Sequence, residues 1–427
     1  MADLTDELIR RIRENRFKNL DLPADLVIPD FGELSVRAIP AGVARLLEAP
    51  DFPAPPLASK ILQPVAGNVR RVLLILVDAL SLTRFKGWLE ADPSLVWNHL
   101  SQDGVLGALT SVTPSTTSTC LPTIWSGLPP AVHGFVGYEL WLKEYGVVAN
   151  MIKQAPFNVD SPAGSLELAG FKPETALPEP TLGVHLKNAG VRVLAFQHYS
   201  IHRSGLSRLL MKGAETVPYS STTDLWFNLL QAFQRHDERP AFSWVYWGDI
   251  DYQSHNYGPD SPRPREAFSE FSRGFRDIFI NGLTPEARRE TAILLTADHG
   301  QISTEPDPFY ELSSHPGLER RLHILPTGEN RMVYFYIRPG QTEAVREYLE
   351  RTFPNQFWLI DPDSAILGGL FGPGQPHPGL RDRIGDLVAI ALGNAYLWWS
   401  RNENIILGRH GGLSEDEMLV PFLAARI

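Results

Sequence analysis

Residues 71–78 read RVLLILVD, an uninterrupted apolar run that ends in an acid. Such a run suits a strand that is buried on both faces, as in a parallel sheet covered by helices. In open α/β sheets the residues just past the carboxyl ends of the strands line the ligand crevice, so Asp78 is a candidate functional residue. If residue 78 is considered without the rest of the chain, an aspartate that caps the next helix explains it equally well.

Two further predicted strands also end in acids. The strand at 241–247 runs into Asp251, and the strand at 292–296 runs into Asp298 and His299. Because parallel strands end at the same edge of their sheet, three such endings indicate a shared site at that edge.

The order of helices and strands predicts the fold class. A helix, a glycine and a strand follow one another over residues 182–196, which is one step of a repeating α/β pattern. Residues 332–360 predict a strand, a helix and a strand, after which residues 386–392 are expected to return to the main sheet. We therefore expect a three-layer α/β/α sandwich around a mostly parallel sheet, with a smaller α+β cap subdomain.

The predicted divisions of the chain follow from these patterns and from loops rich in Pro and Gly. Residues 1–20 predict a surface helix within an N-terminal helical and extended extension. The four segments are the extension (1–68), the first part of the catalytic core (69–304), the cap (305–380) and the C-terminal part of the core (381–427).

Composition limits the function. The chain has 427 residues and a net charge of -10, which argues against a nucleic-acid scaffold because phosphate backbones need a surplus of Lys and Arg. A small phosphate ester remains compatible, since metal ions can supply local positive charge. The single cysteine excludes an intrachain disulfide and thiolate metal clusters.

The sequence also bears on where the protein is found. With no leader-like or membrane-spanning apolar run, we expect a cytoplasmic protein without a membrane partner. The oligomeric state stays open.

Residues 110–134 (TSVTPSTTSTCLPTIWSGLPPAVHG) concentrate hydroxyls, prolines and glycines between apolar runs. This composition favours a turn over a continuous helix or strand. Five consecutive hydroxyl residues, 115–119, are more than capping requires, and we interpret the stretch as the place of a nucleophile. The alternative is a plain N-cap for a helix through Ile124 and Trp125.

Residues with metal-ligand side chains gather at the strand ends and in one C-terminal loop. They are Asp78, Asp251, His255, Asp298, His299 and His410. Three carboxylates and three imidazoles suit Zn²⁺ or Mn²⁺ better than Ca²⁺, which prefers oxygen ligands. Six protein ligands are too many for one catalytic zinc but suit two ions, and paired ions can bind the attacking and leaving oxygens of a displacement at phosphorus.

Taken in order, these motifs resemble the type I phosphodiesterase/nucleotide pyrophosphatase branch of the alkaline phosphatase superfamily, which also includes phosphonoacetate hydrolase. The resemblance runs from about residue 70 to the end of the chain. The segments that carry it are 77–80, 114–127 with 130–134, 251–259, 296–300 and 410–412. It implies a two-metal hydrolase that cleaves a small-molecule phosphodiester, pyrophosphate or phosphonate.

The resemblance also implies roles for single residues. The family's nucleophilic hydroxyl lies ten residues before a glycine that corresponds to Gly127, which puts it at Thr117. Attack by this residue would give a covalent phospho-threonine intermediate that water then hydrolyses. One divalent ion, Zn²⁺ by preference and Mn²⁺ as the alternative, would be held by Asp251, His255 and His410. The second would be held by Asp78, Asp298, His299 and the Thr117 oxygen.

Some positions bear on the substrate. Tyr138 stands where the branch commonly has an asparagine that donates to a phosphoryl oxygen, and its hydroxyl is a candidate substitute. Ser118 stands where nucleotide pyrophosphatases tend to carry a phenylalanine that stacks on the base, so nucleotide specificity is not implied. His198, with Arg203, is a candidate for binding a substrate anion, although a surface role is the favoured interpretation.

Other functions within the superfamily stay open. Sulfatases use Cys-x-Pro-x-Arg, but here Ile124 replaces the arginine and Cys120 lies seven residues before Gly127, so we interpret Cys120 as a buried small residue. A phosphomonoesterase or a phosphomutase would use the same residues. The remaining alternative is a catalytically silent binding or regulatory member, and the presence of all six ligands argues against it.

Overall fold

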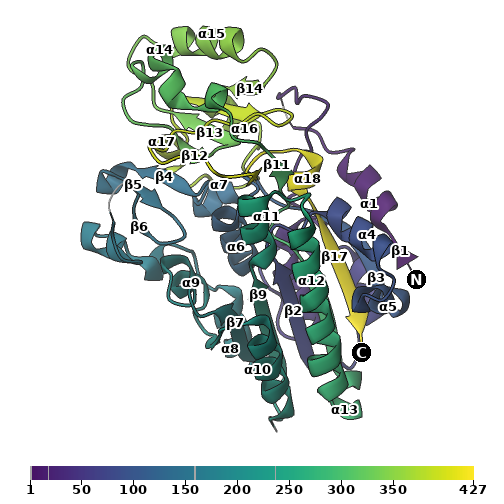
Figure 1. Cartoon of the computed structure of the whole chain (residues 1–427). Helices are drawn as coiled ribbons and strands as arrows, with labels where there is room; N and C mark the ends of the chain where they lie inside the picture. The colour runs from purple at the N-terminus through teal and green to yellow at the C-terminus, as the bar shows by residue number, and fades with distance from the viewer. Residues whose placement is uncertain (1, 18, 158–159, 236) are drawn as a thin grey trace.

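The computed structural model describes residues 2–17, 19–157, 160–235 and 237–427, and its centre is an eight-stranded sheet with helices on both faces (Figure 1). The strands, in their order across the sheet, are β1 (Ala2–Asp3), β3 (Val105–Thr110), β17 (Leu419–Arg426), β10 (Thr291–Thr296), β2 (Arg71–Val77), β9 (Ala241–Trp247), β7 (Arg192–His198) and β8 (Glu215–Tyr219). Strand β17 is antiparallel to both neighbours, and the other pairings in this sheet are parallel. The predicted α/β sandwich around a mostly parallel sheet is confirmed.

Helices surround this sheet. The longer ones are α1 (Thr5–Ile12), α2 (Ile39–Leu46), α4 (Leu82–Ala91), α5 (Val96–Asp103), α6 (Thr117–Ser126), α8 (Leu182–Asn188), α9 (Gly205–Leu210), α10 (Thr222–Gln234), α11 (Asp249–Tyr257), α12 (Pro262–Gly274) and α13 (Pro285–Arg289). Among the described residues, no helix combines the length and the hydropathy that a membrane span requires.

Aromatic side chains hold one helix against each face of strand β9. Trp244 and Trp247 point to opposite faces because side chains alternate along a strand. On one face Trp125 of α6 contacts Trp244, with ring centroids 5.4 Å apart. On the other face Phe271 of α12 stacks on Trp247 at 4.2 Å. Helix α6 is therefore fixed directly against the sheet.

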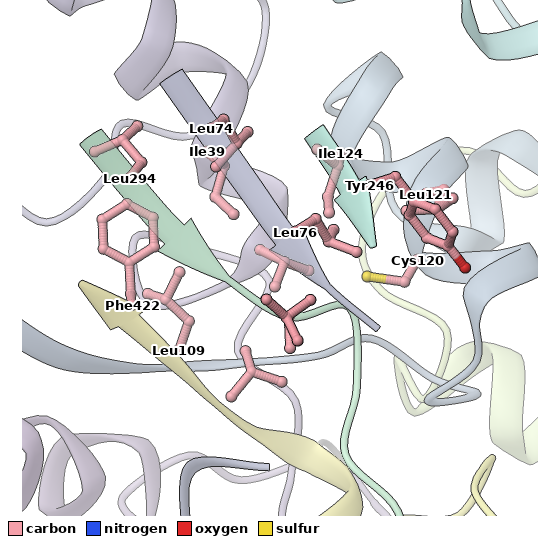
Figure 2. Packing of buried hydrophobic residues seen from close by; sticks show 14 of the residues in the cluster. Ile39, Leu74, Leu76, Leu109, Cys120, Leu121, Ile124, Tyr246, Leu294 and Phe422 are labelled. Atoms are coloured by element: carbon pink, nitrogen blue, oxygen red, sulfur yellow. The ribbon is translucent and has the colours of Figure 1, made fainter. Parts of the chain in front are cut away.

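The core between the sheet and its helices is apolar. Leu74 and Leu76 of β2, Leu294 of β10 and Phe422 of β17 are completely buried and belong to one hydrophobic cluster (Figure 2). Cys120 lies in the same cluster and is also completely buried, as its interpretation as a small core residue predicts. Burial raises the pKa of this thiol well above its usual value.

The N-terminal helix is shorter than predicted. Within the described residues it covers Thr5–Ile12, while residues 1 and 18 of the predicted 1–20 helix lie outside the described part of the chain. Leu8 and Ile12 are buried at 0% and 1% exposure while Asp6, Arg10 and Arg11 are exposed, so the helix lies on the surface and packs one face against the core.

A second, antiparallel sheet forms a smaller subdomain at one end of the first (Figure 1). Its strands, in order, are β14 (Phe357–Ile360), β15 (Leu387–Ala391), β13 (Met332–Phe335), β12 (Thr327–Glu329), β4 (Glu139–Leu142), β5 (Val147–Asn150) and β6 (Ala155–Pro156). Helix α15 (Thr342–Thr352) connects β13 to β14, which agrees with the predicted strand, helix and strand at 332–360.

The prediction that residues 386–392 return to the main sheet is wrong. Strand β15 pairs with β13 and β14 in the small sheet. All residues of β15 are buried. A continuous apolar run is expected for a buried central strand of either sheet, so the sequence pattern alone does not show which strands β15 pairs with. The small sheet also takes β4–β6 from the segment expected to belong to the core, and the boundaries at 305 and 380 stay predictions.

The fold brings the ends of three neighbouring strands to one place. Asp78 follows β2, Asp251 lies in the first turn of α11 just after β9, and Asp298 follows β10. The short strand β16 (Gly408–Arg409) pairs with β11 (Ile302–Ser303), which follows β10 by a few residues. This pairing carries His410 to the same edge of the main sheet.

Candidate active site

Thr117 begins helix α6, so the preference for a turn over a continuous helix is wrong for residues 117–126. Thr116 has an extended backbone, the helix runs from Thr117 through Pro122, and Gly127 ends it in the left-handed region at φ 68°. That conformation suits glycine, which has no Cβ. The first amide groups of a helix have no partner inside it and favour anions, so Thr117 stands at an end of the helix that is suited to phosphate chemistry.

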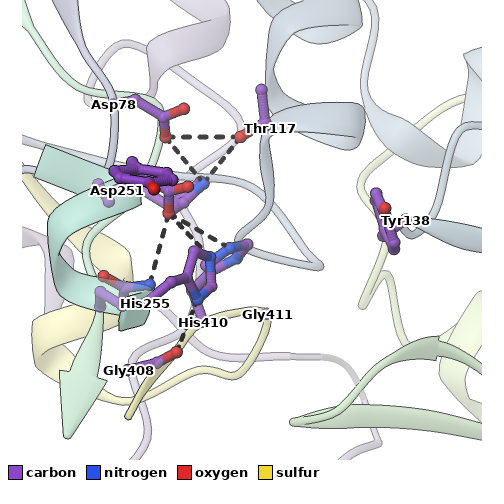
Figure 3. A network of polar contacts seen from close by, with 12 residues as sticks. Asp78, Thr117, Tyr138, Asp251, His255, Gly408, His410 and Gly411 are labelled. Atoms are coloured by element: carbon purple, nitrogen blue, oxygen red, sulfur yellow. Dashed lines mark hydrogen bonds and ion pairs between the residues drawn. The ribbon is translucent and has the colours of Figure 1, made fainter. Parts of the chain in front are cut away.

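The structure brings the six predicted metal ligands together as two adjacent groups (Figure 3). One group is Asp78, Asp298 and His299, and the other is Asp251, His255 and His410. Within each group the candidate ligand atoms lie within 4.8 Å of one another. The rings of His299 and His410 stack at 4.0 Å and join the two groups.

Thr117 lies against the first of these groups. Its hydroxyl oxygen is 3.1 Å from Nε2 of His299 and 3.5 Å from Oδ1 of Asp78. The residue retains 8% of its surface exposure, while His299 has none. The hydroxyl is therefore at the site, and the residue that carries it keeps some contact with solvent.

Each of the three histidines is oriented through its Nδ1 atom by a backbone carbonyl. The contacts are His255 to Gly408 at 2.7 Å, His299 to Gly300 at 2.9 Å and His410 to Ser115 at 3.1 Å. A carbonyl only accepts, so Nδ1 carries the hydrogen and Nε2 keeps its lone pair. Such outer contacts set the tautomer of histidine ligands in metal sites.

Helix geometry and strand ends position the carboxylates. Asp251 and His255 are one turn apart on α11, and their Oδ1 and Nε2 atoms are 3.1 Å apart. Asp298 accepts hydrogen bonds at Oδ1 from the amides of Ala79 and His299, at 3.3 and 3.0 Å. Its Oδ2 is buried and has no hydrogen-bond partner within the described residues. That orphaned oxygen is available to a cation.

Two acids of the site, Asp78 and Asp298, are buried, whereas Asp251 is partly exposed and pairs with His255. Among the described residues, none of the three aspartates forms an ion pair with Lys or Arg. Burial raises the pKa of Asp298 to about 7, and burial together with the neighbouring Asp298 raises the pKa of Asp78 well above its usual value. Divalent cations would compensate these charges, so the donor set fits two metal ions.

Two residues that the sequence reasoning missed support the site. Tyr246 of β9 donates its hydroxyl hydrogen to Oδ2 of Asp78. Side chains alternate along β9, so the sequence could have placed Tyr246 on the same face as Trp244, which is the face that α6 covers. Tyr246 is also one residue before the end of the strand. Glu329 of β12 comes from the small sheet, and no local sequence signal points to it.

Glu329 connects the small sheet to the loops around Thr117. Its Oε1 accepts the hydrogen of the Tyr138 amide at 2.9 Å. A Cβ on Gly411 would lie 2.5 Å from the Cβ of Glu329, so only glycine fits next to His410. Glu329 therefore belongs to the wall of the site.

The two predicted substrate-binding residues lie outside the ligand cluster. The Tyr138 hydroxyl accepts a hydrogen bond from Asn150 Nδ2 at 2.6 Å, and Figure 3 shows this residue well to one side of the histidines. His198 contacts the Ser200 hydroxyl at 2.7 Å through Nδ1 and packs beside Tyr219. Their roles in substrate binding stay predictions.

Fold and site together define a metal-dependent phosphoester hydrolase with a two-centre site at the carboxyl edge of an α/β sandwich. A family model described as type I phosphodiesterase / nucleotide pyrophosphatase matches residues 72–413. The chain belongs to this family, which confirms the resemblance drawn from the motifs.

Solved structures share the fold. Murine ectonucleotide pyrophosphatase/phosphodiesterase 5 is 19% identical, with a TM-score of 0.60 over 83% of this chain and 87% of that one. An inactive threonine-to-alanine variant of the same enzyme in complex with AMP matches at a TM-score of 0.59, with 19% identity over the same shares of the two chains. Phosphonoacetate hydrolase from Sinorhizobium meliloti in complex with phosphonoformate is 21% identical, with a TM-score of 0.60 over 83% of this chain and 89% of that one.

Proposed function

We propose that this protein hydrolyses small phosphoesters or phosphonates through nucleophilic attack by Thr117. The observation that carries the proposal is the position of the Thr117 hydroxyl, 3.1 Å from Nε2 of His299 and beside both ligand groups. A threonine hydroxyl is a poor nucleophile at neutral pH unless its surroundings favour loss of its proton.

The two ligand groups would hold two divalent ions, Zn²⁺ in the first place and Mn²⁺ as the alternative. Asp251, His255 and His410 would hold one ion, and Asp78, Asp298 and His299 would hold the other together with Thr117. When bound, the ions supply the positive charge that stabilises the anionic phosphoryl group and eases loss of the threonine proton.

The residues of the chain then perform two displacements. The Thr117 oxygen forms a bond to phosphorus, the bond to the leaving group breaks, and the threonine proton is lost as the leaving group takes up a proton. Water next forms a bond to phosphorus, the bond to Thr117 breaks, and the hydroxyl is restored. The amide end of α6 favours the negative charge throughout, and Glu329 and the backbone carbonyls hold the loops in place.

The substrate class is proposed from the relatives. The bacterial relative is a phosphonoacetate hydrolase bound to phosphonoformate, and the murine relative, an ectonucleotide pyrophosphatase/phosphodiesterase, binds AMP as an inactive threonine variant. Ser118 in place of an aromatic residue after the nucleophile removes one surface for base stacking, so we favour diesters and phosphonates without a required nucleobase.

Steady-state kinetics of a Thr117→Ala variant test the proposed nucleophile. With bis-p-nitrophenyl phosphate we expect turnover to fall by more than about a thousandfold. Bound zinc, measured by elemental analysis, should stay at the wild-type level because six ligands remain. Turnover that survives the substitution would remove Thr117 from this role.

A substrate panel separates the proposed class from its alternatives. Phosphomonoesters, phosphodiesters, phosphonates and sulfate esters should each be assayed with Zn²⁺ and with Mn²⁺. We expect diesters or phosphonates to give the highest kcat/KM. A preference for monoesters would favour a phosphomonoesterase, and a preference for sulfate esters would contradict the proposal.

A further inference from the structure

A cavity of about 800 Å³ lies in the small subdomain, apart from the metal-ligand cluster. Its walls come from strands β4, β5 and β6 and from the loops around residues 324–326 and 399–402. This volume is in the range of cavities that enclose small organic molecules. Of its lining residues, only Tyr138 has a role described above, as a predicted substrate-binding residue.

The most buried ionisable group of this cavity is the carboxyl of Glu139. Glu139 is 8% exposed, and its Oε2 accepts a hydrogen bond from Trp399 Nε1 at 3.0 Å. Within the part of the chain that the structure describes, this is its one side-chain hydrogen bond, and it has no ion pair there. A buried carboxylate without a counter-ion is costly, so this lining favours a cationic occupant.

Burial has a measurable consequence for this group. It raises the pKa of Glu139 to about 8, and the nearby Glu329 acts in the same direction. An occupant with a positive charge would favour the ionised carboxylate and lower the pKa of Glu139 again.

Aromatic rings line the same space. Tyr138 and Phe157 meet edge to face, with ring centroids 6.3 Å apart and planes at 85°. Trp399 supplies a third ring beside the carboxyl group. Aromatic faces attract cations, and a ring set around a carboxylate is the chemistry that recognises an ammonium group.

The lining also contains two cationic residues, but they do not remove its preference for a cationic occupant. Lys153 is exposed, and Arg401 is 72% exposed and pairs with Glu319 at 2.6 Å. Both are in contact with solvent, whereas Glu139 and Trp399 are buried. Among the described residues of the lining, the one charged type of side chain that is buried is therefore the acid of Glu139, with the ring of Trp399 beside it.

We propose that this cavity binds a small organic ammonium compound, with the Glu139 carboxylate as its counter-ion and the rings of Tyr138, Phe157 and Trp399 around it. The proposal is independent of the role of Thr117. It assigns a ligand site to the small subdomain that is separate from phosphoester hydrolysis.

Isothermal titration of the full-length, metal-loaded protein tests the site. Choline is the probe, and 3,3-dimethylbutan-1-ol, which has nearly the same shape and no charge, is the matched control ligand. We expect choline to bind saturably and the neutral analogue to bind at least about tenfold more weakly. Equal binding of the two, or no heat from choline at about 10 mM, would overturn the proposal.

Variants assign the binding to Glu139. Glu139→Gln keeps the shape of the side chain and should weaken choline binding at least about tenfold, with metal content unchanged. Asp160→Asn is the control, because Asp160 also lines the cavity but is exposed, and it should change affinity by less than about threefold. Unchanged binding by Glu139→Gln would also overturn the proposal. The comparison of choline with its neutral analogue needs no variant and decides the case if Glu139→Gln does not fold.

Discussion

The hydroxyl oxygen of Thr117 lies 3.1 Å from Nε2 of His299, although the two residues are 182 positions apart in the sequence. One stands at the start of α6, and the other follows the end of β10, a neighbour of β2 in the main sheet. The contact exists because a helix start and the ends of parallel strands meet at one edge of the sheet. This convergence is the structural basis of the proposed chemistry.

Removal of metal should abolish activity and weaken the fold. After EDTA treatment and buffer exchange, we expect hydrolysis of bis-p-nitrophenyl phosphate to fall by more than about a hundredfold and to return with Zn²⁺ or Mn²⁺. The midpoint of thermal unfolding should also drop, because Asp251 and the two buried aspartates, Asp78 and Asp298, lose their counter-charge. Full activity in protein that elemental analysis shows to be metal-free would contradict the two-metal mechanism.

Tyr246→Phe should weaken the site without unfolding the protein. The substitution removes only the hydroxyl that donates to Asp78. Loss of such an outer contact typically costs about 10- to 100-fold in metal affinity or activity, and competition with a chelating dye measures the affinity. Tyr219→Phe is the control, since its hydroxyl donates to the Tyr246 carbonyl and not to a ligand. Equal effects of the two variants would speak against a specific role for Tyr246.

The ion pair between Arg331 and Glu417 should be essential for stability. Both side chains are completely buried, with Nε to Oε1 at 2.7 Å, and Glu417 also accepts the amide hydrogen of Gly412, two residues after His410. Arg331→Met should lower the free energy of unfolding in urea by about 3–5 kcal/mol, because Glu417 is left buried and unpaired. Arg401→Met breaks an exposed pair with Glu319 and should cost less than about 1 kcal/mol. A similar small cost for both variants would refute this assignment.

The buried carboxyl of Glu139 should make the protein less stable as the pH rises. Its pKa is about 8 in the folded chain, against an ordinary value of 4.5, so the unfolded chain releases this proton first. Stability from this group is fully present below pH 4.5 and is lost as the pH rises to about 8. The loss over this interval is about 5 kcal/mol.

Thermal unfolding of matched variants between pH 5 and 8 measures this effect. The melting temperature of wild type should fall more steeply with pH than that of Glu139→Gln. Glu350→Gln, a substitution at an exposed position, should follow wild type. Parallel curves for all three proteins would show that Glu139 does not titrate as described.

Much of the fold and the ligand set could be predicted because their signals are local. The run at 71–78 has a composition typical of a buried parallel strand, and the strands at 241–247 and 292–296 end in acids at the edge where such strands meet. The step of four residues from Asp251 to His255 fits one helix turn. These features depend on neighbouring residues and on general rules for parallel sheets.

What the sequence did not predict depends on distant partners. Strand β15 has the same apolar pattern as a strand of the main sheet, and only its pairing with β13 and β14 puts it in the small one. Glu329 reaches the site because β12 pairs with β4, far away in the sequence. Helix α6 forms despite Pro122 because packing against Trp244 outweighs the weak local preference of its residues.

The most direct test of the central claim is to trap the covalent intermediate on Thr117. The metal-loaded enzyme should be quenched in acid during turnover of bis-p-nitrophenyl phosphate and digested, and the peptide that contains residues 110–134 should be analysed by mass spectrometry. We predict a p-nitrophenyl phosphoryl adduct on Thr117, because only one of the two ester bonds breaks in the first displacement, and it should disappear when substrate is exhausted and be absent from Thr117→Ala. Rapid turnover with no adduct on this peptide, or with the adduct on another residue, would contradict the proposed mechanism.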